Sequence, residues 1–376
     1  MTVLHHRSHG LADDETAPDW APLKRDEVAA LLKHYPSLGG AAEVLWRSPR
    51  PFSAAARVRV GHGEVFVKRH HQSVRTPATL REEHAFMAHL RARGLPVPEV
   101  LTDADGNTAI AFGPWTWEVH ACADGIDRYR DEVSWTPLTA ADPARRSGRM
   151  LARLHQAASD YHAPQRSTWM LVARDDLLRS DDPASTLIAQ WPQRPALAAY
   201  LAQRDWQRDL APLLARLRQV QPRIAALPRL WTHNDWHVSN LFWSGTGAAA
   251  DIRTIVDFGL ASPTFALYDL ATAIERNAIA WLHLERGTEA IFPATARQLI
   301  AGYEELLPLD AASRTLLADL LPVVHLDFAL SEVAYFQGAT GSMADADTAY
   351  DTFLLGHAAW FDSAPGQAML DAVGRL

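Results

Sequence analysis

Apolar and polar residues alternate along the first third of the chain, in the pattern of β-strands that bury one face. A helix is predicted from Pro77 to Arg93, because Thr76 is a good N-cap, proline suits the first helical position and a glycine follows the last one. A shorter helix is predicted over residues 26–33. The strand-like stretches are residues 42–47, 56–60, 64–69, 96–101, 108–112 and 117–120. Residues 26–121 are therefore predicted to form a small antiparallel sheet with one main helix.

From Asp142 onward the apolar residues recur every three or four positions, which indicates amphipathic helices. The further helical stretches are residues 184–226, 264–286, 293–306, 310–340 and 347–361. Only residues 231–258 interrupt them, with two strand-like segments around a glycine-containing turn. The change of pattern near residues 121–125 predicts an α+β, bilobal fold, with a larger helical C-lobe over residues 122–376. Residues 1–25 are expected to form a flexible N-terminal extension.

Composition supports two lobes and narrows the class of protein. A chain of 376 residues exceeds the usual length of one domain, and 48 % hydrophobic residues exclude a disordered chain. The net charge of −8 argues against a nucleic-acid partner. A single cysteine, Cys122, excludes an internal disulfide and suits a cytoplasmic location. The sequence has no apolar run of the roughly 18–20 residues that span a bilayer, so no membrane partner is expected. A monomer and a homodimer both remain open.

Three oxygen-bearing residues stand at the ends of the interrupting segment. Asp235 and Asn240 lie five residues apart, and Asp257 follows Asn240 after 17 residues in the sequence Ile-Val-Asp-Phe-Gly. Phosphoryl transfer needs a carboxylate that orients the acceptor hydroxyl and oxygen ligands that hold Mg²⁺ on the phosphates. The pattern therefore predicts Asp235 as the catalytic base, with Asn240 and Asp257 as metal ligands.

The same segments resemble the aminoglycoside phosphotransferase/choline kinase-like family, which are small-molecule kinases with a protein-kinase-like fold. The matching motifs are His233-Asn-Asp235 with Asn240, Ile255-Val-Asp257-Phe-Gly259, Tyr268-Asp269-Leu-Ala271 and Gly148 to His155. The resemblance covers about residues 38–340 and implies ATP (or GTP) and Mg²⁺ as cofactors and a small-molecule hydroxyl as substrate. It departs at Asn234, where the family usually has glycine. Asp269 is expected to brace the catalytic loop, and His233 to orient it.

The residues that bind the nucleotide are expected to lie in the N-lobe. Lys68 ends an apolar strand, as the phosphate-contacting lysine of the kinase fold does. Two neighbouring glutamates follow on the main helix. Glu83 falls on the apolar stripe and Glu82 does not, so a Lys68–Glu83 ion pair is predicted.

Further residues are expected to contact the nucleotide. Phe66 shares a strand face with Lys68 and is expected to stack on the adenine. The linker after the last strand resembles the family's hinge, so the backbones of Ala121 and Ala123 are expected to read the purine edge. No glycine-rich loop is present, and Ser53 is the candidate phosphate contact between the first two strands.

Two other functions remain open. A metal-dependent hydrolase would use His233, Asp235 and His237, since imidazoles suit zinc. A catalytically inactive kinase-like binding protein is the second alternative. The acceptor is also open among an aminoglycoside, an amino alcohol, a sugar and an amino acid. Acidic residues that would receive a cationic substrate are Asp175, Asp176, Asp181, Asp182, Asp327 and Glu332, but arginines between them favour a solvated helical surface instead.

Overall fold

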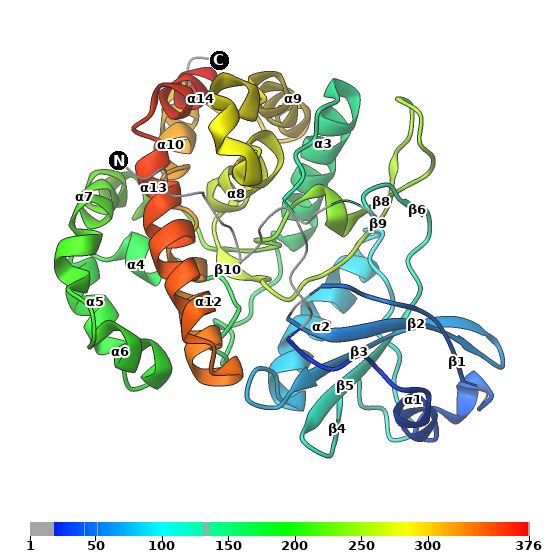
Figure 1. Ribbon diagram of the computed structural model, residues 1–376. Coiled ribbons are helices and arrows are strands. Elements are labelled where there is room, and N and C mark those ends of the chain that lie inside the picture. Colours follow the sequence, from blue (N-terminus) through cyan, green and yellow to red (C-terminus); the bar gives the residue numbers. More distant parts are fainter. Residues whose placement is uncertain (1–18, 41, 51, 131, 133–134, 375–376) are drawn as a thin grey trace.

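The strand-rich part of the chain forms a five-stranded antiparallel sheet with the order β1-β2-β3-β5-β4. The computed structural model describes residues 19–40, 42–50, 52–130, 132 and 135–374 (Figure 1). The strands are β1 (Glu43–Arg47), β2 (Ala54–Val60), β3 (Gly63–His71), β4 (Ile110–Phe112) and β5 (Trp115–Ala121). The β3–β5 register places Lys68 opposite Glu118 and Phe66 opposite His120. These residues therefore share one face of the sheet.

The two faces of this sheet have different chemistry. Odd-numbered residues such as Val65, Val67 and Val119 are buried in a small apolar core with helix α1 (Arg25–Leu32). The opposite face carries Lys68 and His70 of β3 and Glu118 and His120 of β5, and it meets helix α2 (Pro77–Ala92). Helix α2 begins as predicted, because the Thr76 side chain accepts a hydrogen bond from the Thr79 amide and Pro77 fills the first position.

Of the expected flexible N-terminal extension, residues 1–18 lie outside the described residues. Within residues 19–25, Asp19, Trp20 and Leu23 pack against the rest of the protein. The Trp20 indole stacks on His71 and donates a hydrogen bond to the hydroxyl of Tyr335, which in turn donates to Asp19. Leu23 is buried in the small core. This segment therefore joins the sheet to the helical lobe.

The larger lobe is mainly helical and also contains two short sheets (Figure 1). The sheets are β6-β8-β9 and β10-β7, formed by β6 (Ile126–Asp127), β7 (Leu230–Thr232), β8 (Leu241–Trp243), β9 (Ile252–Ile255) and β10 (Ser262–Thr264). The α-helices are α3 (Ala141–Ala158), α4 (Asp176–Arg179), α5 (Pro183–Ala189), α6 (Pro195–Leu201), α7 (Trp206–Ile224), α8 (Ala266–Ala278), α9 (Pro293–Glu304), α10 (Ala311–Leu320), α11 (Leu326–Tyr335), α12 (Met343–Thr348), α13 (His357–Trp360) and α14 (Ala364–Gly374). Segments of 3₁₀ or π helix are η1 (Pro36–Leu38) in the N-lobe, η2 (Val238–Asn240) between β7 and β8, and η3 (Trp281–Ala290), η4 (Phe336–Thr340) and η5 (Ala349–Gly356) between helices of the larger lobe.

The predicted α+β bilobal architecture is confirmed, whereas several of its details were wrong. Residues 96–101 form no strand. Val100 makes only an isolated bridge to His120. Helices α4 and α14 were not predicted, and α12 overlaps the predicted stretch 347–361 only at its last two residues. The predicted stretch 184–226 is divided into α5, α6 and α7. Within the described residues, no helix is both long and apolar enough to cross a membrane.

Helices α3 and α9 cross at a pair of glycines. A Cβ on Gly148 would lie 1.9 Å from the Leu299 carbonyl oxygen, and one on Gly302 would lie 1.8 Å from the Arg145 carbonyl oxygen. Both obstacles are backbone atoms, so a rotamer change cannot relieve them. His155, near the C-terminal end of α3, contacts the Tyr303 hydroxyl of α9 and the Asp269 carboxylate of α8.

Substituting Gly148→Ala is therefore expected to destabilise the protein by about 2 kcal/mol or more, because the two helices must move apart. The free energy of unfolding, measured by urea denaturation, checks this. Gly245→Ala is the matched control, because a Cβ there meets nothing within 4 Å. Equal stability of the two variants would contradict the close crossing.

Candidate active site

The loop between β7 and β8 holds two of the three predicted site residues. The Asn240 side-chain amide donates to the Asp235 backbone carbonyl at 2.8 Å and to its carboxylate at 3.1 Å. With its nitrogen engaged in this way, the Asn240 amide oxygen is the atom free to act as a metal ligand. The loop thus fixes Asp235 and Asn240 against each other.

This loop is braced from behind by Asp269 of helix α8. Its carboxylate accepts hydrogen bonds from the backbone amides of His233 and Asn234, at 2.9 and 2.8 Å. His155 Nε2 lies 3.0 Å from the same carboxylate. The predicted orienting role of His233 has a matching geometry, since its Nε2 lies 3.0 Å from the Val256 carbonyl oxygen on the neighbouring loop.

Asn234 adopts the left-handed backbone conformation that glycine favours, with φ of +62°. Its buried side chain compensates for the strain through hydrogen bonds. The amide oxygen accepts from the hydroxyls of Thr232 and Thr264, and the amide nitrogen donates to the Leu260 carbonyl. The departure from glycine therefore keeps the turn and adds side-chain anchors to it.

Arg276 of helix α8 is a site residue that the sequence motifs did not indicate. Its guanidinium lies 3.1 Å from the Asp235 carboxylate and 4.3 Å from the centre of the Trp135 ring. Burial alone would raise the pKa of the Asp235 carboxyl, but Arg276 and then His237 hold that pKa well below its usual range. Asp235 is consequently ionised throughout the physiological pH range.

Asp257 contacts Lys68 of the N-lobe. Lys68 Nζ lies 3.4 Å from Asp257 Oδ1, and this contact lowers the pKa of the Asp257 carboxyl. Asp257 takes a left-handed φ of +61°, and its side chain is exposed toward the cavity. Its carboxylate and the Asn240 amide oxygen form the kind of hard oxygen donor set that suits Mg²⁺.

The predicted Lys68–Glu83 ion pair is not formed. Glu83 is buried, as its place on the apolar stripe predicted, but its carboxylate pairs with Arg166 Nη2 at 3.3 Å. Arg166 also donates to the Gly259 carbonyl in the Asp-Phe-Gly segment. Glu83 therefore links helix α2 to that loop through an arginine from a distant part of the chain.

Glu118 takes the place beside Lys68 that was assigned to Glu83. Glu118 Oε1 lies 4.0 Å from Lys68 Nζ, directly across the β3–β5 pair. Burial alone would lower the pKa of the Lys68 ammonium, but Asp257, Glu118 and Glu83 together raise it. Strand alternation in the sequence places Glu118 on one face of β5. Only the β3–β5 register shows that Lys68 is its neighbour on that face.

One cavity brings most of these residues together. It is lined by Ser53, Lys68, Glu83, Asp235, Asn240 and Asp257 of the predicted site and also by Arg50, Phe52, His70, Arg75, Trp135, His237, Arg276 and Phe328. Phe66 and the hinge residues Ala121 and Ala123 are not among its lining residues. The Ala121 amide donates to the Glu99 carbonyl, so this amide is not available to a purine.

The histidines of the alternative hydrolase site make hydrogen bonds to the protein backbone. His233 has one ring nitrogen against the Val256 carbonyl, and the other accepts from the Asp235 amide. His237 Nδ1 accepts from the Ser239 amide. Asp235 faces Arg276, which opposes a cation at this carboxylate. His237 Nε2 lies 3.7 Å from the Asp235 carboxylate, but His233 has no ring nitrogen left for a zinc ion.

Most of the acidic residues considered for a cationic substrate pair with arginines or cap a helix, and none of the six lines this cavity. Asp175 pairs with Arg179 and Arg229, and the buried Asp327 pairs with Arg194 at 2.9 Å. Asp182 caps helix α5. The expected solvated helical surface is wrong for Asp175, Asp327 and Glu332, which are buried.

The sequence matches the family described as "Phosphotransferase enzyme family" over residues 50–328, and the chain belongs to this family. It is accordingly a small-molecule kinase of an ATP-dependent family, with an alcohol group as acceptor. The family assignment confirms the predicted phosphotransferase and stands against both alternatives, the hydrolase and the inactive binding protein.

Curated relatives include homoserine kinases. One from Gluconobacter oxydans (strain 621H) is 26 % identical over 250 residues, which is 66 % of this chain and 68 % of the relative. Another from Methylobacterium radiotolerans is 30 % identical over 247 residues, or 66 % of each chain. The matches therefore span about two thirds of these relatives.

Solved structures share the fold at low identity. The microcompartment-associated aminopropanol kinase superposes with a TM-score of 0.59 and 18 % identity, covering 91 % of this chain and 99 % of that one. Spectinomycin phosphotransferase in complex with ADP and spectinomycin gives a TM-score of 0.54 and 11 % identity, covering 95 % of this chain and all of that one.

Proposed function

We propose that this kinase transfers the γ-phosphoryl group of ATP to the hydroxyl of a small hydroxy acid or hydroxy amino acid, with homoserine as the model acceptor. The acceptor oxygen forms a bond to the γ-phosphorus, the bond to the β–γ bridging oxygen breaks, and ADP leaves. The hydroxyl proton passes to Asp235. Because Asp235 is a weak base, it orients the hydroxyl and accepts the proton late, as the new bond forms.

The nucleotide side of the proposal rests on residues that share the cavity. Lys68 supplies a fixed positive charge for the phosphates, and Ser53 lines the same space from the β1–β2 connection. Asn240 and Asp257 supply the oxygen ligands for Mg²⁺, which when bound neutralises charge on the phosphates. Phe66, Glu83 and the backbones of Ala121 and Ala123 remain predicted contributors to nucleotide binding.

The proposed class of acceptor, a hydroxy acid, rests on Arg276. Asp235 is the only ion-pair partner that the described part of the chain offers this arginine, and the pair uses Nη1. A guanidinium presents five donors and can bind a second carboxylate. A carboxylate held there places its own hydroxyl group next to Asp235. Arg50 lines the same cavity and adds to its positive character, whereas burial lowers the pKa of the His237 imidazole and favours its neutral form.

Charge in the cavity disfavours a polycationic acceptor. Among the described lining residues, the carboxylates are Glu83, Asp235 and Asp257. Each has a cationic partner, namely Arg166, Arg276 and Lys68 respectively. An aminoglycoside would bring several ammonium groups to a site whose carboxylates are already neutralised. The homoserine kinases among the relatives agree with a carboxylate-bearing substrate.

A panel of matched acceptors tests this proposal. Homoserine, its amide, aminopropanol and spectinomycin are compared by ADP release at equal concentrations of ATP and Mg²⁺. The kcat/KM of homoserine is expected to exceed that of the amide by about 10- to 100-fold, because a charge-assisted contact contributes about 1.5–3 kcal/mol. Preference for aminopropanol or spectinomycin would overturn the acceptor class while leaving the kinase assignment intact.

Arg276→Gln should change both the pH profile and the acceptor affinity. Without the guanidinium, burial raises the pKa of Asp235, so kcat/KM should acquire an acidic limb that the wild type lacks between pH 5 and 8. The KM for homoserine should rise at least 10-fold or so, while the KM for ATP changes little. Arg204→Gln, on the C-lobe surface, is the control. An unchanged pH profile would contradict the role of Arg276.

A further inference from the structure

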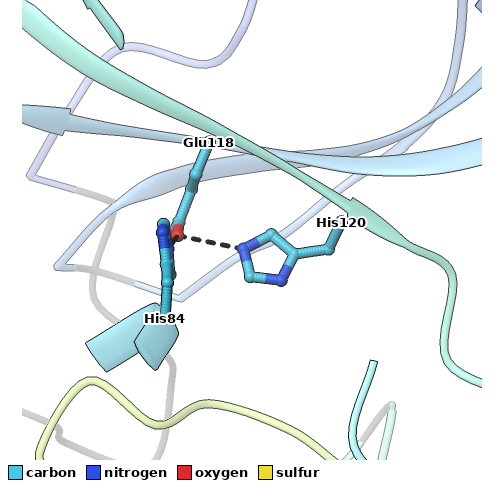
Figure 2. Close-up of side chains that lie close together, drawn as sticks. All are labelled: His84, Glu118 and His120. Atoms are coloured by element: carbon cyan, nitrogen blue, oxygen red, sulfur yellow. Dashed lines mark hydrogen bonds and ion pairs between the residues drawn. The ribbon is translucent and has the colours of Figure 1, made fainter. Parts of the chain in front are cut away.

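A second polar cluster lies on the sheet face next to Lys68, with its buried side chains turned toward one another (Figure 2). His84 Nε2 is 2.6 Å from Glu118 Oε2, and His120 Nε2 is 2.9 Å from the same oxygen. One ligand atom from each of the three residues lies within 4.8 Å of the others. The two imidazoles thus converge on a single carboxylate oxygen.

The fold itself creates this convergence. Glu118 and His120 are two residues apart on β5 and therefore point to the same face. His84 follows Glu83 on α2, which covers that face, and it is buried on the inner side of the helix. His70 of β3 approaches the other oxygen, with its Nε2 2.9 Å from Glu118 Oε1. Three separate elements meet at one point.

Hydrogen bonds inside the protein leave part of this cluster unsatisfied. His120 is 8 % exposed, and its Nε2 approaches Glu118 Oε2 at 2.9 Å without the geometry of a hydrogen bond. Buried polar atoms normally have a partner. The second nitrogen of His84 is engaged, because its Nδ1 lies 2.9 Å from the Thr108 hydroxyl. Metal-bound histidines are typically oriented in this way by an oxygen on the opposite ring nitrogen.

We propose that His84, Glu118 and His120 bind one zinc ion between α2 and β5. The ligands are Nε2 of each imidazole and Oε2 of the carboxylate, a two-histidine, one-glutamate set that zinc accepts together with water. Ligand atoms in a tetrahedral zinc site lie about 3.3 Å apart, since each bond is about 2.0–2.1 Å. The side chains must therefore separate by less than about 1 Å. Nitrogen ligands distinguish this site from the oxygen set at Asn240 and Asp257.

The proposed site has a structural role and does not depend on the identity of the phosphate acceptor. The ion ties helix α2 to β5 and fixes Glu118, whose other oxygen faces His70 and Lys68. Zinc should therefore stabilise the N-lobe. It takes no part in phosphoryl transfer.

The test measures zinc and cobalt binding to the full chain. His5, His6 and His9 are first replaced by glutamine, so that the N-terminal histidines cannot contribute ligands. The protein is stripped with a chelator, dialysed, and titrated with Zn²⁺ or Co²⁺. We expect one metal ion per chain by elemental analysis, visible d–d absorption typical of four-coordinate Co²⁺, and a higher melting temperature with Zn²⁺.

Three variants and a control separate this site from unspecific binding. His120→Gln should weaken Zn²⁺ at least 100-fold, and Glu118→Gln should abolish the Co²⁺ absorption. Thr108→Val keeps all three ligands and should weaken binding by about 10- to 100-fold. His62→Gln, at the exposed turn between β2 and β3, should bind as the parent does. Stoichiometric zinc that survives His120→Gln, or a folded parent that takes up no zinc, would overturn the proposal.

Discussion

Substituting Asp235→Asn is expected to lower kcat by about 10³- to 10⁴-fold, while the affinity for ATP changes less than about threefold. Asparagine preserves the size of the side chain but cannot accept the hydroxyl proton. Nucleotide binding depends on Lys68 and its neighbours across the cleft, so it should persist. Steady-state kinetics and titration calorimetry with ATP measure the two quantities.

The control for this substitution is Asp251→Asn on the hairpin that follows β8, where the aspartate is exposed and pairs with Arg146. That variant should have the activity of the wild type. Turnover within tenfold of wild type in Asp235→Asn would remove Asp235 from the reaction. A matching loss of ATP affinity would instead indicate a collapsed cleft.

Asp257→Asn should reduce kcat/KM by about 10³-fold or more, which corresponds to about 4 kcal/mol of transition-state stabilisation. The change removes a charged ligand for Mg²⁺ and the closest ion-pair partner of Lys68. The Mg²⁺ concentration for half-maximal activity should rise at least about tenfold, because one carboxylate ligand is lost. A magnesium titration at saturating ATP measures this shift. An unaltered magnesium dependence would exclude Asp257 as a ligand.

Loss of Asp257 should also lower the pKa of Lys68, because burial lowers it and this carboxylate makes the largest opposing contribution. Lys68 nevertheless keeps Glu118 and Glu83 nearby, so its ammonium should stay charged at neutral pH. The defect in Asp257→Asn should therefore not be rescued by lowering the pH. This separates a metal-ligand role from a role in charging the lysine.

The parts of the site that the sequence predicted are those carried by short loops. Asp235, Asn240 and Asp257 stand at fixed spacings next to predicted strands, so their type and order already indicate phosphoryl-transfer chemistry. Helix periodicity likewise identified Glu83 as the buried glutamate. These inferences need only local structure, which alternation and helical spacing encode directly.

Contacts between distant segments of the chain could not be predicted from the sequence. Glu83 pairs with Arg166, which comes from a loop 83 residues later, and nothing in the local pattern marks that arginine. Arg276 reaches Asp235 only because α8 packs beneath the catalytic loop. Glu118 becomes the neighbour of Lys68 through strand register, which a one-residue shift would change. Short helices such as α4 lack the length for a periodic signal.

Phosphorus NMR of the reaction mixture tests the central claim most directly. With wild-type protein, ATP, Mg²⁺ and homoserine, one new phosphomonoester should appear for each ADP formed, and omitting the acceptor should stop both. ADP and inorganic phosphate formed without a phosphomonoester, at the same rate with or without the acceptor, would show that the cleft does not transfer phosphate to a hydroxyl held at Asp235.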